Sequence, residues 1–105
     1  MKLSIIFATL WVAITWHSAI AEPVSPSEKQ LTLFANNCVQ CHARPGVGAP
    51  LVGNPAEWKE RVARGEAAML RNVVEGIRGM PPLGYCSACN EADLRVLTRF
   101  MAGIE

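Results

Sequence analysis

The residues Cys38-Val39-Gln40-Cys41-His42 form the strongest chemical signal in the sequence. Two thiols three positions apart, followed at once by an imidazole, are typical of covalent haem attachment, in which each thiol joins one vinyl group and the imidazole binds iron. A structural disulfide, a thioredoxin-type redox pair and half of a zinc site are the other interpretations. We predict haem. The other histidine, His17, lies in a segment that we expect to be removed, so His42 is the only histidine of the mature chain and stands where haem attachment needs it.

With a single histidine left, the sixth iron ligand must be another kind of side chain, unless the iron keeps an open position. Met69 and Met101 fall on the apolar faces of predicted helices, where packing is the commoner role of methionine. Met80 lies between Gly79 and Pro81-Pro82, in a stiff loop that can hold a thioether near iron. We therefore predict Met80 as the axial ligand, and the alternative is a loop methionine that plugs the haem crevice.

A second pair of thiols, Cys86 and Cys89, follows the Met80 loop. A zinc site made of all four cysteines is one interpretation, but the 44 residues between the two pairs exceed the usual ribbon spacing. We favour a disulfide, since an exported chain meets an oxidising compartment. A redox-active dithiol remains open.

Residues 1–21 have the features of an export signal. Lys2 supplies a positive charge, residues 3–16 are mostly apolar, and Ala19-Ile20-Ala21 offers the small side chains that signal peptidase recognises. An uncleaved membrane anchor and a buried helix are the alternatives. We predict a cleaved signal peptide and a single periplasmic domain, residues 22–105, with no stable membrane insertion after cleavage.

The expected mature domain has nine basic and nine acidic side chains and therefore a formal charge of zero. This balance argues against nucleic-acid binding, which needs clustered Lys and Arg, and predicts little electrostatic steering towards a partner. A domain of 84 residues is too short for a dinucleotide-binding fold. It also needs a disulfide, metal or cofactor to complete its core.

The spacing of apolar residues predicts an all-α domain with no strand. Helices are expected over residues 26–37, 54–64, 66–75 and 90–101, with irregular loops rich in Gly and Pro over residues 43–53 and 79–84. The first helix should be capped by Ser25 with Glu28 in a capping box. Asn54, with Glu57 three residues on, should cap the second helix, and Asn90, with Asp93 three residues on, should cap the last. Its buried stripe is expected to comprise Leu31, Phe34, Ala35 and Cys38.

The mature chain resembles the class I c-type cytochromes, and specifically the small bacterial cytochrome c-five subgroup. The matching residues are Phe34, Cys38 to His42, Gly48-Ala49-Pro50, Trp58, Arg61, Gly79-Met80-Pro81-Pro82, Cys86, Cys89 and Phe100-Met101. The resemblance implies the class I cytochrome c fold, four to five short helices wrapped around one covalently attached haem c. One departure is Gln30, where the family usually has a glycine that lets the first and last helices cross closely.

The resemblance also implies roles for individual residues. Cys38 and Cys41 would hold the haem, and His42 and Met80 would be the axial ligands of its iron. The carbonyl of Pro50 would accept the His42 Nδ1 proton, a bond that fixes the ring. Trp58 and Arg61 would lie near the haem propionates; a core-edge and a surface position are the alternatives for this pair. The sequence leaves Tyr85 undecided between the crevice wall and the surface.

These features predict a one-electron carrier, not an enzyme, that exchanges electrons with membrane or periplasmic oxidases and reductases. A gas sensor or peroxidase, a zinc or dithiol protein, and a fixed subunit of a larger oxidoreductase are the alternatives. A weak dimer through an exposed haem edge also remains open.

Overall fold

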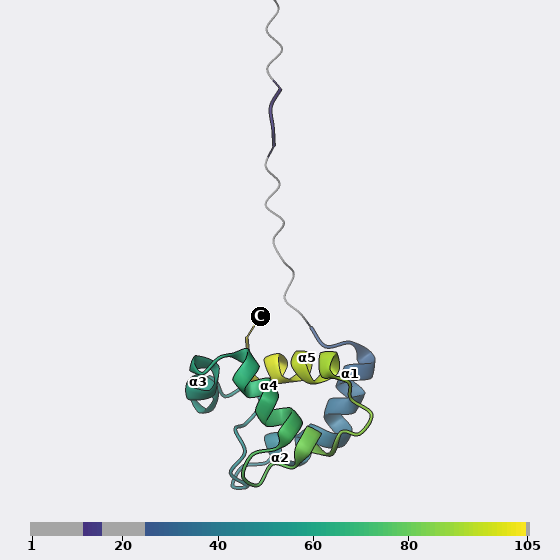
Figure 1. Ribbon diagram of the computed structural model, residues 1–105, viewed down its shortest axis with the longest axis vertical. Helices are drawn as coiled ribbons and strands as arrows, with labels where there is room; N and C mark the ends of the chain where they lie inside the picture. Colours follow the sequence, from purple (N-terminus) through teal and green to yellow (C-terminus); the bar gives the residue numbers. More distant parts are fainter. Residues whose placement is uncertain (1–11, 16–24, 105) are drawn as a thin grey trace, which may run out of the picture.

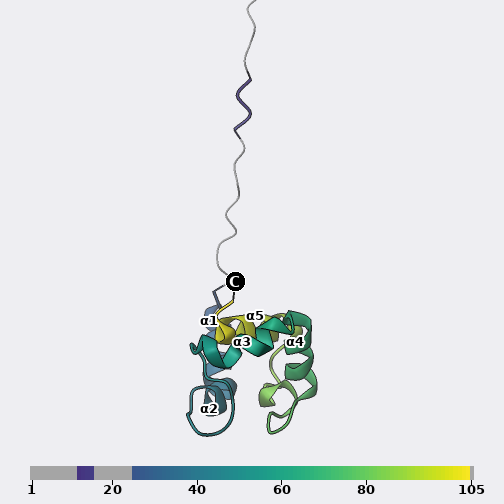
Figure 2. The same cartoon turned by 90° about the vertical axis from the view of Figure 1, so that its left-hand side faces the viewer.

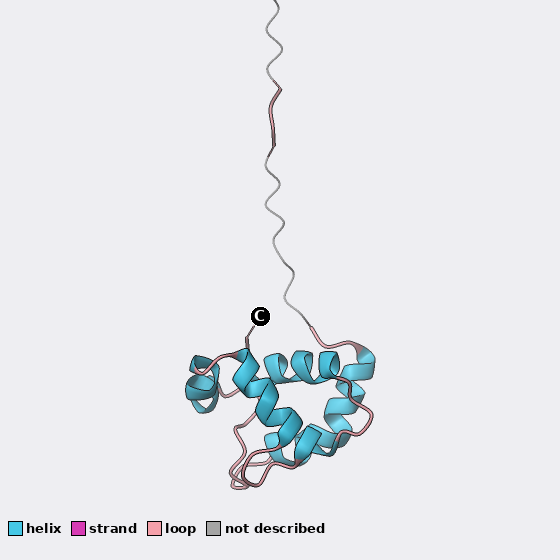
Figure 3. Ribbon diagram, in the orientation of Figure 1, coloured by secondary structure: helices cyan, strands magenta, loops and turns pink. Residues whose placement is uncertain are grey.

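The computed structural model describes residues 12–15 and 25–104 (Figure 1). The expected signal peptide, residues 1–21, and the first residues of the mature domain lie largely outside the described residues. The helical elements are α1 (Glu28–Leu33), η1 (Phe34–Cys38), α2 (Val39–His42), α3 (Pro55–Ala63), α4 (Glu66–Glu75), η2 (Pro82–Tyr85) and α5 (Glu91–Ala102). The described residues contain no strand, so the all-α prediction is confirmed (Figure 3). None of the helices in these ranges is long and apolar enough to cross a membrane.

The first three elements run on without a break as one helical segment that contains a π-turn, η1. The predicted N-cap was wrong, since Ser27 caps α1 in place of Ser25, and Gln30 replaces Glu28 as its partner. Both registers satisfy the capping-box pattern of Ser followed by Glu or Gln three residues later. The observed register also lets Gln30 reach α5, a contact that the local pattern does not contain.

The predicted buried stripe of this first helix is only partly correct. Leu31 is 42% exposed and Ala35 is also exposed, whereas Phe34 and Cys38 pack against the core. The prediction assumed 3.6 residues per turn throughout. The π-turn inserts one extra residue into that period, so Leu31, before the turn, is rotated away from the face of the residues after it.

The remaining helices agree closely with their predicted ranges. Asn90 and Asp93 form the expected reciprocal capping box at the start of α5. The capping predicted for α3 was wrong, because Asn54 makes no side-chain cap. Glu57 instead accepts a hydrogen bond from the Leu51 N–H at 2.6 Å, and so ties the preceding loop to the helix.

The helices are arranged as an arch (Figure 2). α3 and α5 lie across the top, the α1–α2 segment descends on one side, and α4 with η2 descends on the other. The hydrophobic cluster sits where α3, α4 and α5 meet, and comprises Trp58, Met69, Met101 and Ala102. The two sides of the arch also touch, since η1 contacts η2.

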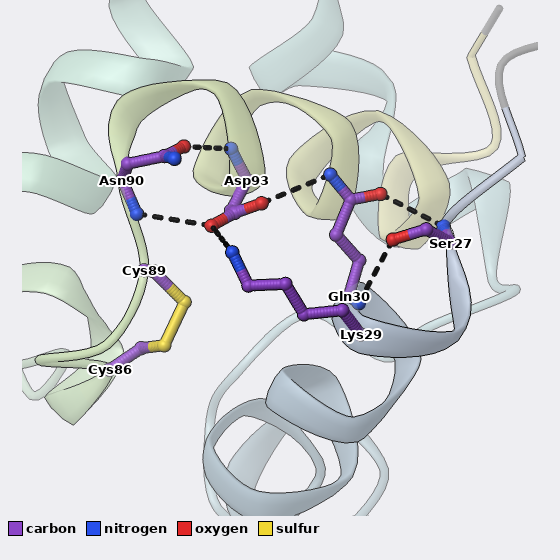
Figure 4. A network of polar contacts seen from close by, with 7 residues as sticks. All are labelled: Ser27, Lys29, Gln30, Cys86, Cys89, Asn90 and Asp93. Carbon is purple, nitrogen blue, oxygen red and sulfur yellow. Dashed lines mark hydrogen bonds and ion pairs between the residues drawn. A yellow bond between two sulfur atoms is a disulfide. The ribbon is translucent and has the colours of Figure 1, made fainter.

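A polar network joins α1 to the first turn of α5 (Figure 4). The Asp93 carboxylate accepts from Gln30 Nε2 at 3.1 Å and pairs with Lys29 Nζ at 3.3 Å. Further along the same two segments, the rings of Phe34 and Phe100 meet edge to face at 5.4 Å. Gln30, the departure from the family pattern, therefore joins the two helices through a side-chain hydrogen bond.

Candidate functional site

His42, the last residue of α2, is buried and held in one orientation. Its Nδ1 lies 2.8 Å from the carbonyl oxygen of Pro50. A carbonyl can only accept, so Nδ1 carries the proton and donates it. The lone pair of Nε2 is then available to a metal, as in histidines whose other nitrogen is hydrogen-bonded.

The loop after His42 is tied back by backbone bonds at its end. Val52 N–H donates to the His42 carbonyl at 2.8 Å, and Gly53 N–H donates to the Met101 carbonyl at 3.4 Å. Together with the bond from Leu51 to Glu57, these contacts hold the peptide that presents the Pro50 carbonyl. The loop is irregular, as its Gly and Pro content predicted.

Trp58 lies against His42, with ring centroids 5.8 Å apart and planes inclined by 24°. Its indole N–H donates to the Leu51 carbonyl at 2.8 Å. The only side-chain donor of Trp58 is therefore engaged with the protein in this structure. Arg61 Nη1 similarly donates to the Glu57 carbonyl at 2.6 Å, while its other N–H groups have no protein partner among the described residues.

The two thiols of the first pair, Cys38 and Cys41, are free. Cys38 is half-buried beside the core cluster and Cys41 is exposed. Desolvation by burial raises the pKa of the Cys38 thiol, so that sulfur keeps its proton at neutral pH. Cys86 and Cys89 have the same spacing in sequence, but those two thiols are joined by a disulfide.

Met80 ends a tight turn that starts at Ile77. The Ile77 N–H donates to the Met80 carbonyl at 3.1 Å, and the Met80 N–H donates back to the Ile77 carbonyl at 2.9 Å. The backbone of Gly76 packs against this turn so closely that a Cβ there would lie 2.8 Å from the Met80 oxygen. On the other side, a Cβ at Gly84 would lie 3.5 Å from the Met80 Cε methyl group. Glycine is therefore required at position 76.

Three residues near Met80 have left-handed backbone conformations although none is a glycine. Their φ values are 54° at Arg78, 61° at Leu83 and 63° at Tyr85. Such conformations are costly for residues with a Cβ and gather at functional sites. Sequence reasoning missed them, because nothing in these residue types indicates a positive φ. Tyr85, which the sequence left undecided, is 81% exposed.

Cys86 and Cys89 are joined by a disulfide, with their Cα atoms 5.4 Å apart. Cys86 is 1% exposed, so the disulfide anchors the end of the Met80 loop in the protein interior. It leads directly into Asn90, the cap of α5. No cluster of three or more His, Cys, Asp or Glu side chains suited to a metal ion occurs in residues 12–15 and 25–104, so the four-cysteine zinc site is not formed.

The donor set fits a covalently bound haem. An imidazole has its Nδ1 committed to the protein and its Nε2 available; one free thiol, Cys38, stands about one helical turn before it and the other, Cys41, directly before it. The thiols are at the end of η1 and in α2, and η1 contacts η2, which begins two residues after Met80. One nitrogen and one thioether are ligands suited to haem iron.

Known proteins agree with this assignment. The family described as cytochrome c oxidase, cbb3-type, subunit III, matches residues 28–101. Cytochrome c5 of Ectopseudomonas mendocina is 36% identical over 74 residues, which cover 69% of this chain and 85% of that protein. Cytochrome c5 of Azotobacter vinelandii is 35% identical over 74 residues, covering 69% and 89%.

More distant relatives point the same way. Cytochrome c-555 of Chlorobaculum thiosulfatiphilum is 31% identical over 71 residues, which cover 64% of this chain and 83% of that protein. A cytochrome c in a solved structure, described as an electron transfer complex of nitrite reductase with cytochrome c, superposes with a TM-score of 0.66. It shares 33% identity and covers 75% of this chain and 96% of its own.

Fold, donor set and relatives define the class, a small c-type cytochrome with one covalently bound haem c that transfers electrons. Within that class, the chain belongs to the family whose model matches residues 28–101 and groups with the cytochromes c5. The resemblance drawn from the sequence is thereby confirmed.

Proposed function

We propose that His42 and Met80 are the two axial ligands of the haem iron and that Cys38 and Cys41 hold the haem through thioethers. The hydrogen bond from His42 Nδ1 to the Pro50 carbonyl carries this proposal, because it selects the tautomer whose Nε2 can bind iron. The bound haem supplies a one-electron couple, Fe(II)/Fe(III). The protein residues attach it, orient its ligands and tune its potential.

Attachment needs no oxidant. The thiols of Cys38 and Cys41 would each add S–H across a vinyl double bond, with sulfur bonding to the carbon next to the ring and hydrogen going to the terminal carbon. Two covalent bonds and an axial histidine then lie within five consecutive residues, so the haem becomes part of the core of a small domain.

The thioether of Met80 completes the coordination. A neutral imidazole and a soft thioether favour the ferrous state, so the potential should lie above that of bis-histidine haem. With His42 and Met80 as its two axial ligands, the iron would have no position left for oxygen or peroxide. We infer that the chain is a carrier and not an enzyme.

The contacts of Trp58 and Arg61 support a role for each. Trp58 supports the face of the His42 ring and uses its N–H to fix Leu51, next to the Pro50 carbonyl. Arg61 retains guanidinium N–H groups that suit a haem propionate. We propose Trp58 as a support for the ligand and Arg61 as the propionate contact.

The cellular context is proposed from the sequence and the relatives. Residues 1–21 would be a cleaved signal peptide, and residues 22–105 a periplasmic domain. Its partners would be membrane or periplasmic redox enzymes. A nitrite reductase is the partner in the complex of the similar cytochrome c. Zero formal charge predicts that docking depends little on ionic strength.

The deciding experiment is a visible absorption spectrum of the exported protein, oxidised and reduced, after extraction with acidified acetone. Haem that resists extraction, with a low-spin c-type spectrum and the far-red band of ferric thioether ligation, is the expected result. Covalent haem without that band would overturn the Met80 ligand and favour a sensor or peroxidase. A colourless protein with bound zinc or reactive thiols would overturn the whole assignment.

A further inference from the structure

The helix that carries the haem-attachment motif contains an unusual feature directly before the first cysteine. Residues Phe34–Cys38 form a π-turn, and the Val39 N–H donates to the carbonyl of Phe34, five residues back. π-turns are rare inside α-helices and occur mostly at functional sites. This turn ends at Cys38, so it sets the direction in which the following motif faces.

The rotation can be worked out from helix geometry. Each residue of an α-helix turns by about 100°, so Phe34 and His42 would lie about 80° apart in an unbroken helix. One additional residue in the turn rotates everything after it by about 100° relative to what precedes it, which reduces that separation to about 20°. The π-turn therefore brings Phe34 and His42 onto one face.

The contacts agree with this geometry. Phe34 and Cys38 both pack against the core cluster that contains Trp58. His42 stacks on the same Trp58 ring. Leu31, which an unbroken helix would place on that face, is 42% exposed instead. The histidine of the motif thus reaches the face of Phe34 because of the π-turn, and Cys38, one helical turn before His42, lies on the same side.

One side chain bonds across the turn. Asn37 Nδ2 donates to the carbonyl of Leu33, the residue that precedes the turn, at 2.9 Å. Asparagine has a low helix propensity, and its short amide favours such local bonds to the backbone. Its neighbour Asn36 is exposed, and its side chain makes no hydrogen bond to any of the residues that the structure describes. The two asparagines of the turn therefore differ in a testable way.

We propose that Asn37 is a positioning residue for haem attachment, and that its amide holds the π-turn that directs Cys38 and His42 towards the haem. This inference rests on the proposed roles of Cys38, Cys41 and His42. Asn37 would touch neither the haem nor the iron, and would act only through the backbone of the turn. Its loss should therefore lower the proportion of chains in which both cysteines are bonded to haem.

The sharpest test compares Asn37→Thr with Asn37→Val. The two replacements have the same shape, but only threonine offers an O–H donor to the carbonyl four residues back. Thr32 and Thr98 of this protein make that bond, at 3.0 and 2.7 Å. Asn37→Ala serves as the deletion and Asn36→Ala as the matched control. All are produced in cells that attach haem to exported cytochromes.

The readout is the number of thioethers per chain. Free thiols are alkylated, and the mass of the peptide that contains residues 38–42 is measured by mass spectrometry. The position of the pyridine haemochrome band distinguishes one thioether from two. The measured ratio compares chains that have both thioethers with chains that have one or none. In Asn37→Val and Asn37→Ala this ratio should fall about fivefold, as expected when one ordinary hydrogen bond is lost. Asn37→Thr and Asn36→Ala should match the wild type.

Equal ratios in Asn37→Thr and Asn37→Val would overturn the inference, even if both variants melt at a lower temperature or yield no haem protein. Should Asn37→Ala fail to fold, the Thr and Val pair still decides the question. A wild-type chain without haem on its two cysteines would instead overturn the proposed function. The two failures are thus distinguishable.

Discussion

The segment that carries His42 and the segment that carries Met80 are held in different ways. On the His42 side, hydrogen bonds link side chains and backbone, among them those of Pro50, Leu51 and Trp58. On the Met80 side, the backbone itself is restricted. The restraints are the turn from Ile77 to Met80 with its two reciprocal backbone hydrogen bonds, the residues with left-handed conformations, and a disulfide. The difference follows from the chemistry of the two side chains.

An imidazole has a second ring nitrogen whose N–H can donate to a carbonyl, so hydrogen bonding fixes the orientation of the ring. A thioether is only a weak acceptor, and no hydrogen bond can orient it firmly. A methionine must therefore be placed by the backbone that carries it. The strained residues near Met80 are consistent with this requirement, because strain of this kind persists only where the surrounding structure enforces it.

The largest expected effect contrasts His42→Ala with Met80→Ala. The first should abolish stable haem protein, since the motif then lacks its axial ligand and the small domain lacks its core. The second should keep the haem attached but lower the potential by more than about 59 mV, the equivalent of a tenfold change in a one-electron equilibrium. Haem content after acid–acetone extraction and redox titration measure both.

Met69→Leu and Met101→Leu are the matched controls, because both methionines are buried in the core and a Met-to-Leu exchange keeps the volume. Both should retain the far-red band of thioether ligation. An unchanged band and potential in Met80→Ala would show that the iron has a different ligand, and would remove the basis of the comparison.

The next prediction compares a glycine-to-alanine substitution in the Met80 loop with one in the loop after His42. Gly76→Ala, on the Met80 side, should lower the free energy of unfolding by about 3 kcal/mol, because its Cβ meets the Met80 oxygen at 2.8 Å and its φ is +81°. Gly46→Ala, on the His42 side, has a similar φ of +83° but open space around it, and should lose only about 1 kcal/mol. Denaturant titration of both variants gives the difference.

Equal losses at the two glycines would mean that the Met80 turn can move away from position 76 without cost. The account of a rigid Met80 side would then be wrong. The visible spectrum of Gly76→Ala provides a second check, since a displaced turn should weaken the far-red band.

A smaller effect is expected from the disulfide. Replacing Cys86 and Cys89 together by alanine should lower the free energy of unfolding by about 2 kcal/mol, the chain-entropy value for a four-residue ring. Haem attachment through Cys38 and Cys41 should continue. If the disulfide also restrains Met80, the double variant should bind added imidazole at the iron more readily than the wild type does. No loss of stability and no change in imidazole binding would make the disulfide dispensable to the Met80 side.

Sequence reasoning predicted the local parts of this molecule well. The motif from Cys38 to His42, the ranges of the later helices and the cap of α5 depend on neighbours within a few residues. The bond from His42 to Pro50 came from the family resemblance, and the structure places those atoms 2.8 Å apart.

Other features depend on contacts or strain that no local pattern reveals. Ser27 was missed as a cap because its partner Gln30 is also bonded to Asp93, 63 residues away in sequence. The π-turn was missed because its sequence also fits an ordinary helical period. The left-handed conformations beside Met80 were missed because arginine, leucine and tyrosine usually avoid them.

Asp93 links the two sides that the comparison separates (Figure 4). It follows the disulfide by four residues and bonds to the helix that leads to His42. Hydrogen bonds from Gln30 Nε2 and from the Asn90 backbone N–H, with Lys29 Nζ beside them, hold the pKa of this carboxyl below its ordinary value despite partial desolvation. Its pKa is therefore lower in the folded than in the unfolded protein.

The sign of the pH dependence follows from that difference. A carboxyl with a lowered folded pKa stabilises the fold at pH values above its unfolded pKa of about 3.9, and this stabilisation disappears as the pH falls through the folded value. The difference in unfolding free energy between wild type and Asp93→Asn should therefore be constant near neutral pH and shrink below about pH 3.9. Gln30→Ala, which removes the largest cause of the shift, should flatten the same curve. A difference that persists unchanged at low pH would show that the carboxylate charge does not hold α1 to α5, and that the two sides of the site are joined through the Phe34 and Phe100 contact instead.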